Sequence, residues 1–110
     1  MEIKEDKNNS VYIIQVLGRI DASTAPELEK KFHDLLESGE QNFLIDLSNM
    51  DYISSVGLRV LLVLAKRTKT SSGKVVLCNL QEQVYEVFEI SGFTSIFQIC
   101  PDQDEAIRLF

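Results

Sequence analysis

Hydrophobic and polar positions along the chain alternate between a strand pattern and a helix pattern. Runs of strand length are VYIIQVLG (11–18), NFLIDL (42–47), KVVLCNL (74–80) and SIFQIC (95–100). Segments with apolar residues at helical spacing cover residues 24–39, 55–70, 79–90 and 102–110. A short strand at residues 2–5 and the turn-rich DKNNS precede the first run and form a hairpin with it. The predicted order after this hairpin is therefore α-β-α-β-α-β-α.

This order predicts an α/β domain built around one mixed sheet. Strands that alternate with helices pair in parallel through right-handed crossovers, and the N-terminal hairpin adds one antiparallel edge. NFLIDL and KVVLCNL do not alternate apolar and polar residues, as is typical of strands covered on both faces. We expect one domain over residues 1–110, with a sheet of about five strands, mostly parallel, covered by about four helices.

Several residues carry the signals of helix ends. Thr24 and Glu27 have the spacing of a capping box at the start of the first helix, and Gly39 is placed to end it. Gly92 is placed to end the third helix, and Asp102 is placed to cap the last one. These positions set the helix boundaries that we expect.

Composition and charge narrow the classes of function. The chain has 110 residues, 45% hydrophobic and 25% charged, which is typical of a globular domain. A net charge of -6 repels phosphate backbones and anionic lipid headgroups, so we expect no direct nucleic-acid partner. No apolar run approaches the ~20 residues that span a bilayer, and MEIKEDKNNS lacks the apolar stretch of a signal peptide. We therefore expect a cytoplasmic protein without membrane insertion.

The residue types that bind metals or carry redox chemistry are sparse. Cys78 and Cys100 lack CxxC spacing, and a single histidine, His33, does not complete a zinc site with them. We predict buried thiols in strands, with no metal and no cofactor. Asp46 and Asp51 flank a loop; a magnesium pair is one interpretation, and solvated loop carboxylates are the favoured one.

The segment DYISSVGLRVLL (51–62) places two serines at the N-terminal end of a predicted apolar helix. Ser55 could simply cap the helix by accepting from a backbone amide, which is worth about 1 kcal/mol. The motif of a hydrolase nucleophile is absent, because Ile53 occupies the first glycine position of G-x-S-x-G. His33, the one histidine available as a base, lies on the polar side of another helix, so we expect no catalytic residues and no enzyme.

One face of this helix has the character of a binding surface. At about 100° per residue, a single stripe holds Ser55, Arg59, Leu62, Val63 and Lys66. The two basic residues indicate that the stripe faces solvent, with an apolar centre as in a protein-docking surface. The alternative is that a neighbouring helix covers Leu62 and Val63.

Ser55 is also well placed to be phosphorylated. The first-turn amides and the helix dipole would stabilise the added charge, so the fold would survive the modification. Up to two negative charges would then lie beside Arg59 and Asp51, and would reject an acidic or apolar partner surface. Simple capping and a phosphorylation switch both remain open on these grounds.

Three stretches together resemble a known family. DLSNMDYISSVGLRVLL resembles the signature segment of STAS-domain proteins, particularly bacterial anti-sigma factor antagonists, in which a phosphorylatable serine precedes G-L. GRIDASTAPELEKKF and ISGFTSIFQI resemble two further segments of that family. The resemblance covers essentially the whole chain, and its specificity lies in the combination and order of the motifs.

The resemblance implies a regulator that changes partners. The unphosphorylated form would bind an anti-sigma factor with serine kinase activity and so release a sigma factor, and phosphorylation with ATP would end that binding. A PP2C-type serine phosphatase would restore it. Alignment on Gly57 and Leu58 carries the acceptor onto Ser55, and leaves Ser54, where many relatives have aspartate, as a minor candidate.

The predicted partner-binding surface combines the stripe with positions that the resemblance adds. Its residues are Asp21, Ser54, Ser55, Val56, Gly57, Arg59, Leu62, Val63 and Lys66. Asp21 matches a polar family position near the docking surface, although it could be a turn residue only, and Gly57 could serve close helix packing. Arg59 replaces a family glycine, so the partner specificity of relatives does not carry over. We expect a monomer or a weak homodimer.

A second function is compatible with the same fold. The chain could be a STAS subunit of a membrane lipid or anion transport complex, where it would contact a nucleotide-binding subunit. The two functions differ in what the stripe on residues 55–66 touches.

Overall fold

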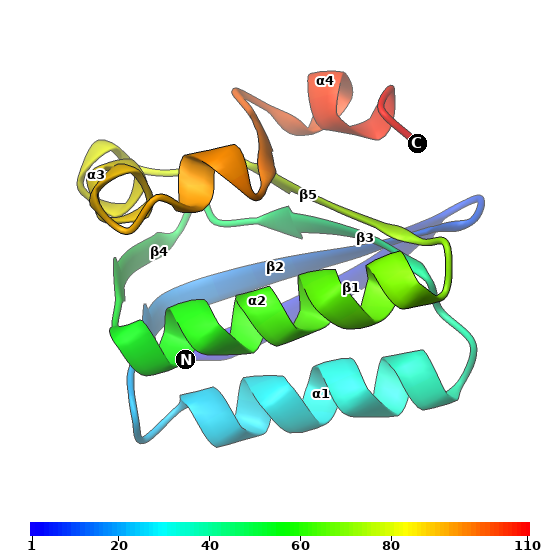
Figure 1. Cartoon of the computed structure of the whole chain (residues 1–110), viewed down its shortest axis with the longest axis horizontal. Coiled ribbons are helices and arrows are strands. Elements are labelled where there is room, and N and C mark those ends of the chain that lie inside the picture. The colour runs from blue at the N-terminus through cyan, green and yellow to red at the C-terminus, as the bar shows by residue number, and fades with distance from the viewer.

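A computed structural model describes all residues from 1 to 110 and shows six strands, four α-helices and one short 3-10 helix (Figure 1). The strands are β1 (Glu2–Asn8), β2 (Val11–Ile20), β3 (Asn42–Asp46), β4 (Met50–Ile53), β5 (Lys74–Cys78) and β6 (Gln98–Cys100). The helices are α1 (Ala25–Glu37), α2 (Ser55–Thr70), α3 (Glu82–Ile90), η1 (Phe93–Ser95) and α4 (Gln103–Ile107). No helix is both long enough and apolar enough to cross a membrane.

The strands form the mixed sheet that the sequence predicts. Their order is β1-β2-β3-β5-β6, with β1 antiparallel to β2 and every other pairing parallel. Helices α1 and α2 run side by side along one face, and α4 lies on the opposite side of the sheet (Figure 1). The α/β architecture with one antiparallel N-terminal edge and four helices is therefore confirmed.

Strand β4 was not predicted from the sequence. After β3 ends, the chain returns to β2 and pairs with its last residues, with a register shift between Gly18 and Arg19. Gly18 adopts a φ of 92°, which L side chains rarely reach, and its N–H donates to the Asn49 carbonyl at 2.8 Å. One strand thus pairs with β3 along its first half and with β4 at its end.

Apolar side chains fill both faces of the sheet. The larger cluster of twenty buried residues lies between the sheet and α1, α2 and α3, and a cluster of five lies under α4. Strands β3 and β5 are buried almost throughout, as their unbroken apolar runs predict. The sheet is covered on both faces, so binding positions are confined to helix surfaces and loop edges.

Two elements begin three residues later than predicted. Helix α3 begins at Glu82 and not at Asn79, because Asn79 takes a left-handed conformation with φ 59° that ends the strand before it. The segment SIFQIC is a strand only over Gln98–Cys100, and its first residue belongs to the short helix η1. Gly92, with φ 76°, follows α3 as expected.

The capping box predicted at α1 is wrong. Thr24 is the N-cap residue, but its side chain caps no helix amide. Its Oγ1 accepts from the Asp21 N–H at 2.9 Å and donates to the Arg19 carbonyl at 3.0 Å, so it closes the loop before the helix. Gly39 (φ 101°) ends α1 as predicted, and Asp102 caps α4 by accepting from the Glu105 N–H at 2.9 Å.

Asp46 is buried, which corrects the expectation of a solvated loop carboxylate. Only 4% of the residue is exposed. Its Oδ1 accepts from the Ser48 N–H at 2.9 Å, and its Oδ2 accepts from the side-chain amides of Asn79 at 3.3 Å and Gln103 at 2.7 Å. One carboxylate therefore joins the end of β3 to the end of β5 and to α4, whereas Asp51 is exposed.

The two cysteines lie side by side in the sheet as free thiols. Cys78 on β5 and Cys100 on β6 are register partners; the first is buried and the second half-buried. Burial raises the pKa of the Cys78 thiol to about 12, and it also raises the pKa of Cys100. Neither thiol ionises near neutral pH.

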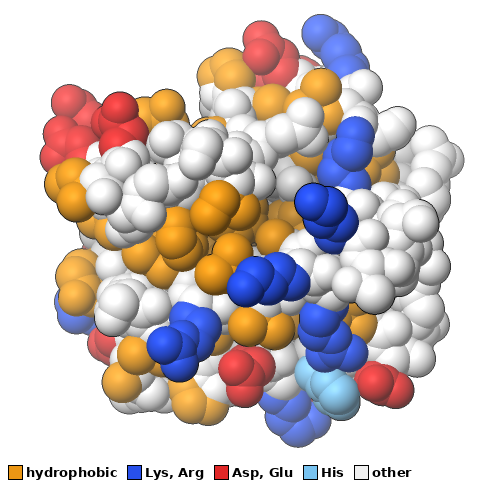
Figure 2. Space-filling view, viewed as in Figure 1, with side chains coloured by type: hydrophobic (Ala, Val, Ile, Leu, Met, Phe, Trp, Pro, Cys, Tyr) orange, Lys and Arg blue, Asp and Glu red, His pale blue; other side chains and the backbone are white.

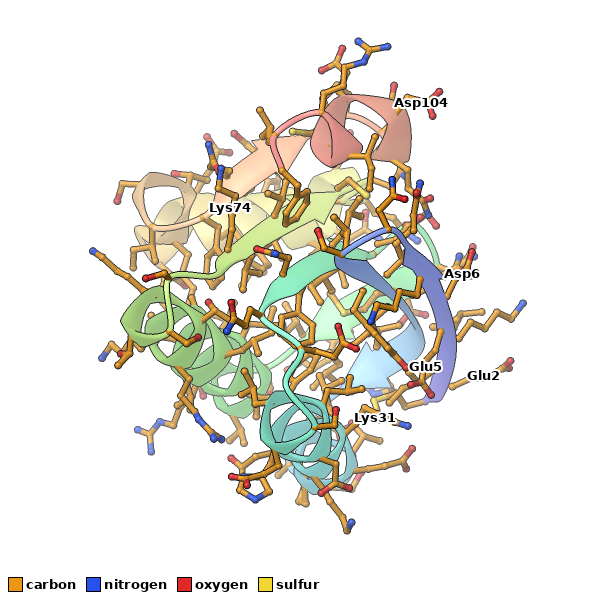
Figure 3. All side chains as sticks on the ribbon, turned by 90° about the vertical axis from the view of Figure 1, so that its right-hand side faces the viewer. Glu2, Glu5, Asp6, Lys31, Lys74 and Asp104 are labelled. Carbon is orange, nitrogen blue, oxygen red and sulfur yellow. The ribbon has the colours of Figure 1, made fainter.

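Strand β1 forms an exposed edge with many charged side chains, among them Glu2, Glu5 and Asp6 (Figure 3). Glu5 anchors this edge, because it accepts from the Lys31 Nζ of α1 at 2.8 Å and from the Tyr12 hydroxyl at 2.5 Å. Lys31 lowers the pKa of Glu5, and the Glu5 carboxylate raises the pKa of Tyr12 to about 12. Charges along an open edge discourage pairing with another chain.

Replacing Asp46 with alanine should lower the free energy of unfolding by about 2 to 3 kcal/mol, because three part-buried donors lose the buried carboxylate that accepts from them. Equilibrium urea denaturation measures this loss. The matched variant Asp51→Ala removes an exposed carboxylate and should change the same quantity by less than about 0.5 kcal/mol. Similar small effects in both variants would contradict the structural role of Asp46.

Candidate functional site

The start of α2 is fixed by the sheet. Ile20 and Ile53 are register partners at the end of β2 and β4, and the Ser54 N–H donates to the Ile20 carbonyl at 2.9 Å. The next residues along the two strands, Asp21 and Ser54, therefore lie at the same edge of the sheet. Backbone pairing places the serine pair beside the loop that leads into α1.

The two serines have different roles, and the expectation that Ser55 could be the cap is wrong. Ser54 is the N-cap: its backbone is extended, and its Oγ accepts from the Gly57 N–H at 3.2 Å. Its carbonyl accepts the Leu58 N–H at 2.9 Å. Ser55 is the first helical residue, exposed, and its hydroxyl makes no hydrogen bond to another group of the chain. The Ser55 hydroxyl is therefore free for chemistry or binding.

Gly57 is a packing residue and does not belong to the exposed surface, which corrects its place among the predicted partner-binding residues. It is buried, and a Cβ at this position would lie 2.7 Å from Ile20 Cγ2 and 2.8 Å from Ile53 Cγ1. Such distances are too short for any side chain larger than hydrogen. Glycine here allows α2 to approach β2 and β4 closely.

The predicted stripe lies on the surface of α2. Arg59 and Lys66 are exposed, Val63 is 41% exposed and Leu62 is half-buried. Val56, 44% exposed, adds an apolar side chain in the first turn. We call Ser55, Arg59, Leu62, Val63 and Lys66 the docking strip; its role in binding stays a prediction.

Helix α2 differs in charge from the rest of the chain. It carries four basic residues and no acidic one, in a chain whose net charge is -6. Figure 2 shows basic side chains gathered around exposed hydrophobic ones on the face that α2 presents. Arg67 lies 3.9 Å from Glu37 Oε1, whereas Arg59, Lys66 and Lys69 form no ion pair. The docking strip therefore combines apolar contact area with unpaired positive charge.

Asp21 organises the loop next to the serines. Its Oδ1 accepts from the Ser23 N–H at 3.0 Å and from the Ser23 hydroxyl at 2.6 Å, and its Oδ2 pairs with the Arg19 Nε at 3.2 Å. These donors, Ser23 first and Arg19 next, lower the pKa of Asp21 to about 2. The interpretation as a turn residue is thus correct for the free protein, and its contribution to docking stays a prediction.

Arg19 and Tyr52 are exposed residues that sequence reasoning missed. The Arg19 guanidinium carbon lies 4.5 Å from the centroid of the Tyr52 ring, and the two residues are register partners between β2 and β4. Tyr52 is 44% exposed. If β4 had been recognised as a strand that pairs with β2, the contact would have been predictable, because the register of the two strands sets Arg19 opposite Tyr52.

A groove separates the two long helices. It has a volume of about 340 Å³ and is lined by Phe32 and Leu36 of α1 and by Val63 and Arg67 of α2, among others. His33 lies on its rim, where the Arg67 side chain meets its Nδ1 at 3.2 Å. The one histidine therefore belongs to this groove and not to the serine pair at the start of α2.

Comparisons with known proteins identify relatives over the full length. The profile of the STAS domain family matches residues 2–106. BtrV of Bordetella bronchiseptica, named as a candidate anti-sigma factor antagonist, is 39% identical over 110 residues, which are 100% of this chain and 95% of that protein. An anti-sigma-B factor antagonist of Bacillus subtilis is 29% identical over 108 residues, 98% of this chain and 96% of the relative.

Solved structures share the fold. An anti-sigma factor antagonist from Mycobacterium paratuberculosis superposes with a TM-score of 0.89 at 23% identity, over 98% of this chain and 92% of the other. The Bacillus cell fate determinant SpoIIAA in its phosphorylated form superposes with a TM-score of 0.77 at 14% identity, over 99% and 100% of the two chains. The arrangement of β2, β4 and α2 thus belongs to a fold with several known examples.

Truncating each serine should separate their roles. Ser54→Ala removes the acceptor of the Gly57 N–H and should lower the free energy of unfolding by about 1 kcal/mol. Ser55→Ala should change it by less than about 0.5 kcal/mol, because no contact within the chain is lost. Urea denaturation of both variants measures the difference, and a larger loss for Ser55→Ala would contradict the assignment of the cap.

Proposed function

The chain belongs to the STAS domain family, and from this we propose that it is an anti-sigma factor antagonist controlled by phosphorylation of Ser55. The relatives are named as anti-sigma factor antagonists, and like them the chain acts as a regulator and not as an enzyme. The observation that carries the proposal is the Ser55 hydroxyl, which is exposed and free at the start of α2. The neighbouring Ser54, and not Ser55, caps the helix.

In the unphosphorylated state, the docking strip binds an anti-sigma factor that has serine kinase activity, in the cytoplasm, and a sigma factor is released. Leu62 and Val63 supply the apolar centre of this contact, and Arg59 and Lys66 supply its charged border. Asp21, Ser54 and Val56 flank the strip at the edge of the sheet. Unpaired cations on α2 favour an acidic surface on the partner.

Phosphorylation transfers one phosphoryl group from ATP to the chain. The Ser55 Oγ forms a bond to the γ-phosphorus, the bond from that phosphorus to the β-phosphate oxygen breaks, and ADP leaves. The hydroxyl proton passes to a base of the kinase, since this chain holds no base at Ser55. A PP2C-type serine phosphatase reverses the modification by hydrolysis and returns the free hydroxyl.

The modification changes the surface and leaves the fold intact. Ser55 is exposed and forms no contact that a phosphate would break, while Ser54 keeps the helix capped. A phosphoserine carries about -1.5 to -2 charges at neutral pH, next to the apolar centre of the strip. The like charge of an acidic partner and the cost of desolvating the phosphate then prevent docking.

Capture of partners tests this proposal. Wild-type protein and Ser55→Asp serve as parallel baits in a lysate of the native host, with bound proteins identified by mass spectrometry. We expect an ATP-binding serine kinase to bind the wild type at least tenfold better than Ser55→Asp, and to phosphorylate the wild type but not Ser55→Ala. Ser10→Asp is the matched control, because it adds the same charge in the exposed β1–β2 turn, at the opposite end of the molecule from the start of α2 (Figure 1).

Two outcomes would contradict the proposal. Transporter subunits captured equally by wild type and Ser55→Asp would favour the transport-complex function. A kinase that still phosphorylates Ser55→Ala would place the acceptor elsewhere, with Ser54 tested next.

A charge in the middle of the docking strip should abolish binding without unfolding the chain. Leu62→Glu should weaken binding of the captured kinase at least tenfold and lower the free energy of unfolding by less than about 1 kcal/mol, because Leu62 is only half-buried. Leu61→Glu, at the adjacent but fully buried position, should unfold the chain. Calorimetric titration and urea denaturation measure the two effects; unfolding by Leu62→Glu would show that Leu62 belongs to the core.

A further inference from the structure

We propose that Arg59 binds the phosphoryl group on Ser55, so that the modified chain holds its own phosphate. This inference rests on the proposed function in one respect, namely that Ser55 is the residue modified. It adds a residue that receives the phosphate and a second effect of the modification on the docking strip.

The helix places the two side chains together. Ser55 and Arg59 are four residues apart in α2, and residues with this spacing are neighbours on one face, with Cβ atoms about 5 to 6 Å apart. Both side chains line the same surface hollow of about 190 Å³, with Val56 as its third lining residue. A phosphate on the Ser55 Oγ would therefore enter a hollow that the Arg59 side chain already borders.

Arg59 is the arginine of this region without an intramolecular partner. Arg19 pairs with Asp21 at 3.2 Å and lies over the Tyr52 ring, and Arg67 contacts His33 and lies near Glu37. Arg59 is exposed and forms no ion pair and no side-chain hydrogen bond. Its guanidinium is therefore free to receive an anion without losing an existing contact.

Ser55 is equally free to direct a phosphate toward Arg59. The helix cap is supplied by Ser54, so rotation of the Ser55 side chain breaks no hydrogen bond. Guanidinium groups form paired, charge-assisted hydrogen bonds with phosphate oxygens, a geometry that the ammonium group of lysine does not reproduce. The cation next along the strip, Lys66, lies eleven residues from Ser55, about three helical turns.

The other charged groups around the site do not compete for the phosphate. Asp21, in the loop after β2, and Asp51, on β4, are acidic and repel it. Arg19 is the alternative cation, but the Asp21 carboxylate holds it. Phosphorylation then has two effects at once: it adds negative charge at Ser55 and it withdraws Arg59 from the border of the docking strip.

The test uses the full chain with phosphoserine incorporated at position 55 during translation, so that no kinase is needed. Phosphorus NMR across a pH titration gives the second pKa of the phosphoserine. A nearby guanidinium favours the dianion and lowers this pKa, so Arg59→Gln should raise it by about 0.3 to 0.5 unit and Arg59→Lys by a smaller amount. Lys66→Gln and Arg19→Gln are matched controls, each removing one cation, and should leave it within about 0.1 unit.

Each remaining result would overturn the proposal. An unchanged pKa in Arg59→Gln would show that the phosphate does not contact Arg59, and an equal rise in Lys66→Gln would indicate only the general field of α2. A rise confined to Arg19→Gln would assign the phosphate to the other arginine. Because the phosphoserine is incorporated directly, these failures concern Arg59 alone, whereas failure of the kinase capture concerns the proposed function. The amide spectrum of each unmodified variant confirms that it is folded.

Discussion

The pairing of β4 with the last residues of β2 is the contact on which the site depends. It requires the positive φ of Gly18, where β2 changes its partner from β3 to β4, and it ends with the hydrogen bond from the Ser54 N–H to the Ile20 carbonyl. Gly57 then allows α2 to lie directly against this pair of strands. The first turn of α2 is thus fixed by the backbone of the sheet, and its outward side chains can vary without moving it.

The two adjacent serines divide stability from regulation. Ser54 stabilises the helix and is half-buried, whereas Ser55 is exposed and makes no contact that the fold needs. A modification on Ser55 therefore acts on partners and not on folding. The same separation holds along the helix: Leu58, Leu61 and Leu64 are buried against the core, and the strip on the opposite face is left for binding.

Helical and strand periodicity were sufficient to predict the architecture, the bounds of α2 and the orientation of the docking strip. Three features were not predictable, because they depend on contacts between distant residues. The sequence MDYI has too few residues for a periodic signal, so β4 is seen only through its pairing with β2. The buried Asp46 carboxylate accepts hydrogen bonds from side-chain amides that lie 33 and 57 residues away in the sequence. The choice of Ser54 over Ser55 as the cap follows from the extended backbone that β4 imposes on Ser54.

The two native thiols lie in the sheet and react poorly, so a single cysteine introduced on the surface of α2 could be labelled selectively. Cysteine reacts with maleimides as the thiolate, and the raised pKa values of Cys78 and Cys100 keep both residues protonated at neutral pH. Cys78 is also fully buried. A cysteine introduced at an exposed position of the helix would ionise more readily and react first. A fluorophore attached there would report partner exchange in the natural cysteine background, with no need to replace the native thiols.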